Sequence, residues 1–313
     1  WTELKQIGGR IQAGRAVCSR CQVTYPVRDG IGLFLPPDLQ PDDLWEESAT
    51  GLARYLETYP EIRTQLLESP LHELEPVDRF IRAMYLEELR DFGAAEAALN
   101  ASREHLYTTE FYQSLNELIS EAVQLASRGP GPIVDLASGM GTLLTRLAGQ
   151  TAVPLIGTDI SPRILRRNRD RFRYQGIGDN ISFLACDARR MPFRSGAVPT
   201  LVTHLGLANI RQAGTLLREL RRVTAGRFLC THIFYLPEDT VHVDLLRQHG
   251  MDRLNLQESV LKAFAEAGWK VRVLRSVRVP HRPTPRSTLI EGFGIDALPV
   301  RETRVDLVLL VAE

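Results

Sequence analysis

The stretch IVDLASGMGT, residues 133–142, carries the strongest structural signal in the chain. An apolar run at 133–136 precedes small residues and the start of a helical pattern, which predicts a buried strand, a tight loop and a helix. In an open α/β sheet, ligands bind beyond the carboxyl ends of the strands, where this loop would lie. Small residues there let a ligand approach the backbone; they are Ala137, Ser138, Gly139 and Gly141. A tight turn without a ligand is the alternative.

Short apolar runs alternate with helical patterns throughout the chain after residue 132. The candidate strands are Ile133–Leu136, Leu155–Gly157, Ile181–Leu184, Thr200–Thr203, Arg227–His232, Lys270–Val277 and Val305–Val311. The candidate helices are Leu143–Gly149, Ser161–Tyr174, Ala213–Val223 and Gln257–Glu266. Strands that alternate with helices predict a mostly parallel sheet wound on both faces.

Composition divides the chain into three regions. Residues 1–37 are Gly-rich and contain two cysteines, and residues 38–126 show helical spacing of apolar residues. The breaker Ser-Arg-Gly-Pro-Gly-Pro at 127–132 then opens the α/β region, residues 127–313. We expect a small N-terminal module, a helical region that caps the ligand site, and an α/β core.

Three acidic residues follow successive predicted strands, namely Asp135, Asp159 and Asp187. A dinucleotide site prefers G-x-G-x-x-G, but the third position of that pattern is Leu144. Asp135 would also repel a pyrophosphate, whereas it suits a ligand with an ammonium group. Asp159 could accept the two hydroxyls of a ribose, and Asp187 the amine of adenine beside the Ala188 amide. Capping of the following helix is the alternative role for each acid.

With these motifs in place, the chain from about Ser127 to Gly268 resembles the class I S-adenosylmethionine-dependent methyltransferases, the group that includes the ubiquinone/menaquinone enzymes. The matching segments are Val134–Gly141, Gly157–Ser161, Cys186–Phe193, Leu217–Gly226 and Ala267–Trp269. Two positions depart from the family pattern: Ala137 replaces the usual Gly, and Val198-Pro199-Thr200 replaces Phe-Asp-Val at the fourth strand.

The resemblance implies a Rossmann-like fold with a seven-stranded, mostly parallel sheet that ends in an antiparallel hairpin. It also implies S-adenosylmethionine as the cofactor. Asp135 and the loop Ala137–Gly141 would meet its methionyl part, and Asp159 its ribose. The adenine would contact Ile160, Asp187 and Ala188.

The predicted ends of the fourth and fifth strands border the expected position of the methyl group. His204 is a candidate general base, because an imidazole titrates near neutral pH; packing against the cofactor is its alternative role. Candidate substrate contacts are His232 and Tyr235 in the core and Tyr107 and Tyr112 in the helical region, with core packing as the alternative.

Cys18 and Cys21 form a C-x-x-C pair that resembles the closing half of a small zinc ribbon. A structural zinc site needs four ligands, usually from two such pairs. Because the chain begins at Trp1 rather than Met, we expect the other pair upstream, so zinc is expected only if that pair completes the site. Four cysteines are too few for a disulfide scaffold and predict a cytoplasmic protein.

Charge is unevenly distributed although the net charge is zero. Residues 41–100 contain 14 acidic residues and 5 arginines, whereas residues 161–230 contain 14 arginines and 4 acidic residues. The basic run Arg163–Arg173 is either a solvated helix face or an attraction for an anionic substrate. No apolar run is long enough to span a membrane.

These observations favour a methyltransferase that acts on a small molecule. The first alternative is a ribosomal RNA methyltransferase that uses the basic stretches Arg163–Arg173 and Arg272–Arg286 and the zinc ribbon. The second alternative is a non-catalytic module that binds the cofactor or docks a partner.

Overall fold

The computed structural model describes residues 2–7, 9–19, 22–35 and 44–313. Its strands are β1 (Thr2–Ile7), β2 (Arg10–Val17), β3 (Thr24–Arg28), β4 (Ile31–Leu33), β5 (Ile133–Asp135), β6 (Leu155–Asp159), β7 (Ile181–Ala185), β8 (Val198–His204), β9 (Thr224–Tyr235), β10 (Val271–His281) and β11 (Thr303–Ala312). Its α-helices are α1 (Leu44–Thr58), α2 (Pro60–Glu68), α3 (Pro76–Glu88), α4 (Phe92–Leu106), α5 (Thr109–Ser127), α6 (Thr142–Ala148), α7 (Pro162–Tyr174), α8 (Ala213–Val223), α9 (Thr240–Gln248) and α10 (Gln257–Glu266). Short 3₁₀ turns lie at Leu71–Glu73, Leu207–Asn209 and Asp252–Leu254.

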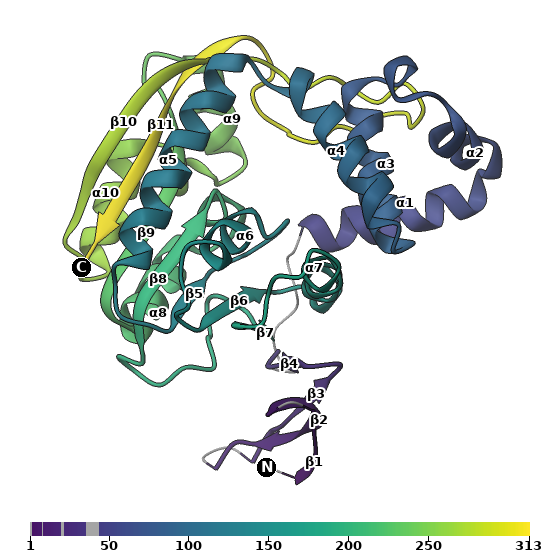
Figure 1. The fold of residues 1–313 in the computed structure, drawn as a ribbon. Helices are drawn as coiled ribbons and strands as arrows, with labels where there is room; N and C mark the ends of the chain where they lie inside the picture. The colour runs from purple at the N-terminus through teal and green to yellow at the C-terminus, as the bar shows by residue number, and fades with distance from the viewer. Residues whose placement is uncertain (1, 8, 20–21, 36–43) are drawn as a thin grey trace.

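One mixed sheet with the order β1-β2-β3-β4-β7-β6-β5-β8-β9-β11-β10 runs through the molecule, and β1–β4 extend away from the helix-covered core (Figure 1). Strands β7, β6, β5, β8 and β9 are parallel to one another, and β11 and β10 are antiparallel to their neighbours. The chain moves from β5 to β6 and β7 on one side and then returns to β8 on the other. This reversal places a topological switch point, where ligands bind in such sheets, beside the end of β5.

The expectation of a seven-stranded sheet is wrong, because four further strands from the N-terminal region join it. Strand β4 pairs in parallel with β7, from Ile31 opposite Phe183 to Leu33 opposite Ala185. The Phe34 N–H extends this pairing by donating to the Ala185 carbonyl at 2.7 Å. The β7 edge of the core is therefore covered by β4 rather than exposed.

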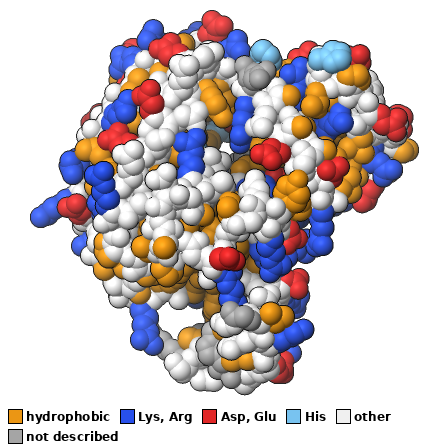
Figure 2. Space-filling view, viewed as in Figure 1, with side chains coloured by type: hydrophobic (Ala, Val, Ile, Leu, Met, Phe, Trp, Pro, Cys, Tyr) orange, Lys and Arg blue, Asp and Glu red, His pale blue; other side chains and the backbone are white. Residues whose placement is uncertain are grey.

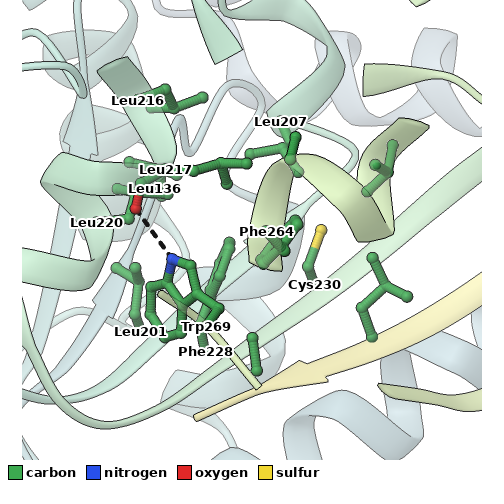
Figure 3. Packing of buried hydrophobic residues seen from close by; sticks show 14 of the residues in the cluster. Leu136, Leu201, Leu207, Leu216, Leu217, Leu220, Phe228, Cys230, Phe264 and Trp269 are labelled. Atoms are coloured by element: carbon green, nitrogen blue, oxygen red, sulfur yellow. Dashed lines mark hydrogen bonds between the residues drawn. The ribbon is translucent and has the colours of Figure 1, made fainter. Parts of the chain in front are cut away.

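Helices cover both faces of the core sheet. Buried residues of α5, α6 and α7 pack on one face, and those of α8 and α10 on the other. On the face covered by α8 and α10, Trp269 is 3% exposed and its indole N–H donates to the Leu217 carbonyl at 2.9 Å (Figure 3). Phe228 and Phe264 pack around the same indole. The expected strands and helices of the α/β region are present, and α9 is an additional helix that we did not expect.

Helices α1–α4 form a separate lobe beside the core, which we call the α1–α4 lobe (Figure 1). The connection 282–302 between β10 and β11 crosses over to this lobe, where Ile290 joins its apolar cluster. Asp78 of α3 accepts hydrogen bonds from Ser287 and from Thr288, the latter at 2.9 Å from its hydroxyl. Helix α5, which we assigned to the helical region, instead packs on the core through residues such as Phe111 and Leu118. The domain boundaries themselves stay predictions.

Within the described residues, no helix is both long and apolar enough to cross a membrane.

Candidate functional site

A cleft of about 650 Å³, including its open mouth, lies at the carboxyl ends of β5 and β6, next to the switch point. Its lining combines the loop after β5, the end of β6 and the loops after β7 and β8. The lining residues are Leu136, Ala137, Gly139, Thr158, Asp159, Ile160, Cys186, Asp187, Ala188, Arg189, Asn209, Ile210 and Arg211.

The loop after β5 is held in a conformation that exposes its backbone to the cleft. Ala137, Gly139 and Gly141 all have positive φ, at 50°, 48° and 70°, and glycine adopts such angles at the lowest cost. A Cβ on Gly139 would meet no atom closer than 3.9 Å, so that position faces open space. Ser138 does not line the cleft; its hydroxyl donates to the Thr158 carbonyl and fastens the loop to β6.

Asp159 joins the two loops that form the cleft. Its carboxylate accepts the Gly139 N–H at 2.9 Å and the Ser161 N–H at 3.1 Å. The N-cap of α7 is Ser161, whose hydroxyl accepts the Ile164 N–H. Asp159 therefore supports both the loop and the start of the helix while it also lines the cleft.

Asp135 is buried behind the loop at 1% exposure and does not line the cleft. Neither carboxylate oxygen has a hydrogen-bond partner among the described residues. Burial raises the pKa of this carboxyl well above its usual range; the nearby Ser138 side chain acts in the opposite direction, and the charge of Asp159 raises the pKa further. A buried carboxyl without a partner is costly, which fits a cationic or hydrogen-donating ligand group in its vicinity.

Asp187 lines the cleft with its carboxylate already engaged. The Arg189 side chain donates to both of its oxygens, including Nη2 to Oδ2 at 2.7 Å, and the Arg189 N–H donates to Oδ1 at 2.7 Å. Any contact from a ligand amine would have to share these acceptors. Ile160 and Ala188 line the cleft as expected for residues next to a flat ring, although no ligand contact tests their role.

His204 ends β8 outside the lining of the cleft. Its Nδ1 lies 2.7 Å from the hydroxyl of Thr231 on the neighbouring strand. Burial lowers its pKa to about 4, and the positive charge of Arg146 acts in the same direction. The imidazole is therefore neutral near pH 7 and can accept a proton, although only weakly.

The four candidate substrate contacts do not line this cleft. Tyr107 and Tyr112 are both half-buried, and the Tyr107 hydroxyl donates to Asp296 at 2.8 Å. Tyr235 stacks on His242 at a centroid distance of 5.3 Å. His232 is 1% exposed with its Nε2 2.5 Å from the Leu254 carbonyl, so the core holds this side chain away from solvent.

Several lining residues were absent from our expectations. Arg189, Asn209, Ile210 and Arg211 come from the loops after β7 and β8. Since both loops follow parallel strands, the same strand-end argument that selected Asp187 could have selected them.

The cysteine pair gives no metal site in the part of the chain that the structure describes. Cys21 lies outside the described residues, and Cys18 is half-buried with its carbonyl accepting the Gln22 N–H at 2.9 Å. Over those described residues, no group of three or more His, Cys, Asp or Glu side chains could hold a metal ion. The expectation of zinc is not supported there.

Residues 133–226 match the family described as a methyltransferase domain, and this segment contains the loop, Asp159 and Asp187. The matched segment is a methyltransferase domain, as the resemblance to S-adenosylmethionine-dependent enzymes predicts. The residues at its cleft fit that cofactor, because the loop exposes its backbone and a buried carboxylate, Asp135, lies behind it without a partner.

Curated relatives of the methyltransferase domain are named ubiquinone/menaquinone biosynthesis C-methyltransferases. The one from Acidiphilium cryptum is 32% identical over 131 residues, which are 38% of this chain and 53% of that protein. The one from Burkholderia cenocepacia is 28% identical over 203 residues, which are 60% of this chain and 80% of that protein. The chain spans about half the length or less of the first relatives it matches.

A solved structure supports the fold of the domain. The YcgJ protein from Bacillus subtilis aligns with a TM-score of 0.50 and 17% identity, over 63% of this chain and 97% of that protein. At this identity the likeness concerns the fold alone.

Proposed function

We propose that this protein transfers a methyl group from S-adenosylmethionine to a small molecule. The observation that carries the proposal is the arrangement at the cleft, where the Gly139 backbone and the Asp159 carboxylate meet beside the unpartnered Asp135. Adenosine and a charged amino-acid tail require these features together: acceptors for ribose hydroxyls and a carboxylate for an ammonium group.

Each part of the cofactor would have its own partners. Asp159 would accept the ribose hydroxyls, the loop at 137–141 would border the methionyl part, and Ile160 and Ala188 would flank the adenine. Asp135 would lie toward the amino group. When bound, the cofactor supplies a methyl group on a positively charged sulfur, which is already a good leaving group.

The contribution of the protein is then alignment and removal of water, with a proton acceptor where the nucleophile needs one. His204 is the proposed acceptor. If Thr231 accepts the proton of Nδ1 at their 2.7 Å contact, Nε2 carries a free lone pair. The lowered pKa of this imidazole suits a substrate whose own proton is acidic, such as a phenol or enol, because a weak base then suffices.

A small-molecule substrate is favoured over RNA by two observations. The curated relatives are named as enzymes of quinone biosynthesis, and several arginines of the basic run are paired within the protein. Tyr107, Tyr112, His232 and Tyr235 stay proposed substrate contacts only if a substrate reaches beyond the cleft.

The experiment that tests this proposal uses cofactor labelled on its methyl group. The protein is incubated with this cofactor and a cell extract, and the label is separated into small-molecule, RNA and protein pools. We expect the label in the small-molecule pool. Label confined to RNA would establish the first alternative, and no transfer to any pool beside tight cofactor binding would favour a non-catalytic module.

A structural zinc and a cytoplasmic location stay predictions from the cysteines alone. Determining the native sequence upstream of Trp1 tests the first. A second C-x-x-C pair within about 10 residues would support a site with Cys18 and Cys21, given the usual spacing of such pairs.

A further inference from the structure

The α1–α4 lobe meets the core through a buried ion-pair cluster. Glu87, at the end of α3, is 5% exposed. Its Oε2 lies 3.0 Å from Arg167 Nε, and its Oε1 accepts Arg171 Nη1 at 2.8 Å. The two arginine side chains, both on α7, are 8% and 12% exposed. One carboxylate therefore lies between two largely buried guanidinium groups.

The same two arginines reach the loop that borders the cleft. Arg171 Nη2 donates to the Met140 carbonyl, and Arg167 Nη2 lies 3.4 Å from the Met140 sulfur. Between them, Asn168 donates to the Gly139 carbonyl at 2.7 Å. The carbonyls of Gly139 and Met140 are thus both bound by side chains of α7.

Close packing makes this contact sensitive to small displacements. A Cβ on Gly141 would lie 2.9 Å from Phe172 Cζ and 3.1 Å from Arg171 Nη2. The loop and α7 therefore have little room to move independently, and any reorientation of Arg171 would change the position of the Met140 carbonyl.

Glu87 is the group that can orient these arginines. A buried guanidinium needs a carboxylate to offset the loss of hydration, and the planar fork of arginine lets it bond two partners at once. Arg171 uses this geometry: one nitrogen binds Glu87 of the lobe, and the other binds the loop. Without Glu87, two like charges would remain close together with their main counterion removed.

We propose that Glu87 is a positioning residue for the cofactor loop, holding Gly139 and Met140 through Arg171 and Arg167. This inference rests on the proposed function, because it assigns the α1–α4 lobe a part in binding the same cofactor. Since coupling between two equilibria is reciprocal, cofactor binding also strengthens the packing of the lobe against α7.

The chain offers a matched control in the next residue. Glu88 also pairs an arginine of α7, Arg163, across the same interface. The described contacts of Arg163 include none to the loop. Replacing Glu87 or Glu88 with Gln removes one carboxylate from the same junction, but only the first change removes the direct carboxylate partner of the arginines that contact Met140.

The test compares wild type with Glu87→Gln, Glu88→Gln and Arg171→Lys by calorimetric titration with S-adenosylhomocysteine. We expect Glu87→Gln to weaken binding ~10-fold, which corresponds to about 1.4 kcal/mol, and Glu88→Gln to change it less than ~2-fold. Arg171→Lys keeps the positive charge beside Glu87, yet a compact ammonium cannot bind Glu87 and the Met140 carbonyl at once as the planar guanidinium does. We therefore expect Arg171→Lys to weaken binding about as much as Glu87→Gln. Equal effects of the two Gln variants, or none in Glu87→Gln, would overturn the inference.

Amide hydrogen exchange without any ligand gives a second readout, which separates this inference from the proposed function. Residues 139–141 should exchange faster in Glu87→Gln and Arg171→Lys than in wild type or Glu88→Gln. If wild type does not bind S-adenosylhomocysteine but the loop exchanges faster in those two variants, the proposed function fails and the coupling stands. Unchanged loop exchange in both variants would refute the coupling. If Glu87→Gln does not fold, Arg171→Lys decides the question.

Discussion

Asp159 has structural partners even without a ligand, since its carboxylate binds the Gly139 and Ser161 N–H groups. The sequence presents ribose binding and helix capping as alternatives, but a carboxylate has enough lone pairs to serve both. We therefore expect Asp159→Ala to weaken S-adenosylhomocysteine binding by roughly 10²-fold or more, from two charge-assisted bonds of about 1.5–3 kcal/mol each.

Stability should fall in the same Asp159→Ala variant, by about 1–3 kcal/mol, because two buried N–H groups lose their acceptor. Calorimetric titration beside urea unfolding measures both effects. Asp159→Asn keeps one acceptor oxygen, so its affinity and its stability should lie between those of Asp159→Ala and wild type. Affinity that is unchanged in Asp159→Ala would remove the ribose assignment.

Asp135 gives a prediction that depends on pH. Its pKa is raised in the folded protein, mainly by burial, whereas the unfolded chain has an ordinary value near 3.8. The unfolded state therefore releases this proton first, so wild type loses stability as pH rises above about 4 and until the folded group itself ionises. Asp135→Asn does not titrate and should escape this loss while it weakens cofactor binding.

Urea unfolding of wild type and Asp135→Asn over a pH series measures the difference. The stability of the variant relative to wild type should increase from pH 4 toward neutral pH. A constant difference across this range would mean that the carboxyl has a partner that the described contacts do not contain.

The residues of the site differ in how far the sequence reveals them. The positions of Asp159 and Asp187 in the cleft were predictable because the ends of parallel strands meet at one edge of the sheet, whereas Asp135 lies buried behind the loop. Glu87 was not predictable, because it lies 84 residues before Arg171 and local patterns carry no information about such a contact. The sequence shows only that residues 41–100, which include Glu87, are rich in acidic residues.

Among the elements, the segment that leads into β10 places a buried indole against the helices on one face of the sheet. Trp269 packs on Phe228 and Phe264 and donates to Leu217 of α8 (Figure 3). We expect Trp269→Ala to lower the free energy of unfolding by about 3–5 kcal/mol through loss of this buried volume. Val300→Ala, at a side chain that is 53% exposed, is the control and should change it by less than about 0.5 kcal/mol.

Chemical denaturation of both variants tests this packing. A loss below about 1 kcal/mol in Trp269→Ala, a value typical of a surface position, would show that the indole is not part of the core. Cofactor affinity should stay near wild type, since Trp269 is not among the residues that line the cleft.

The elements of the α/β region were predictable because apolar runs and helical spacing are local signals. Strands β1–β4 were not, since β1 and β2 have no buried residue and the pairing of β4 with β7 joins distant segments. The contact between residues 282–302 and the α1–α4 lobe was missed for the same reason. It depends on single polar residues such as Asp78 rather than on periodicity.

Over the whole molecule, part of the uneven charge of the sequence is balanced by ion pairs between the α1–α4 lobe and α7. The acidic lobe supplies Glu87 and Glu88 to three arginines of α7, and Figure 2 shows basic and acidic side chains interspersed over one face. We expect structured RNA to bind only weakly, with dissociation constants of ~10⁻⁴–10⁻⁶ M near physiological salt, as for non-specific contacts. Filter binding of a stem-loop RNA at several salt concentrations checks this, and nanomolar binding at physiological salt would favour the RNA alternative.

If the cleft at the ends of β5 and β6 binds S-adenosylmethionine, the demethylated product S-adenosylhomocysteine should stabilise the folded protein, and thermal unfolding measures this effect. Only a ligand of the native state shifts the equilibrium, by about 2.7 kcal/mol at 100 times its dissociation constant. We predict that S-adenosylhomocysteine raises the melting temperature by roughly 5 °C, whereas NAD leaves it unchanged. A rise with NAD and none with S-adenosylhomocysteine would contradict the account.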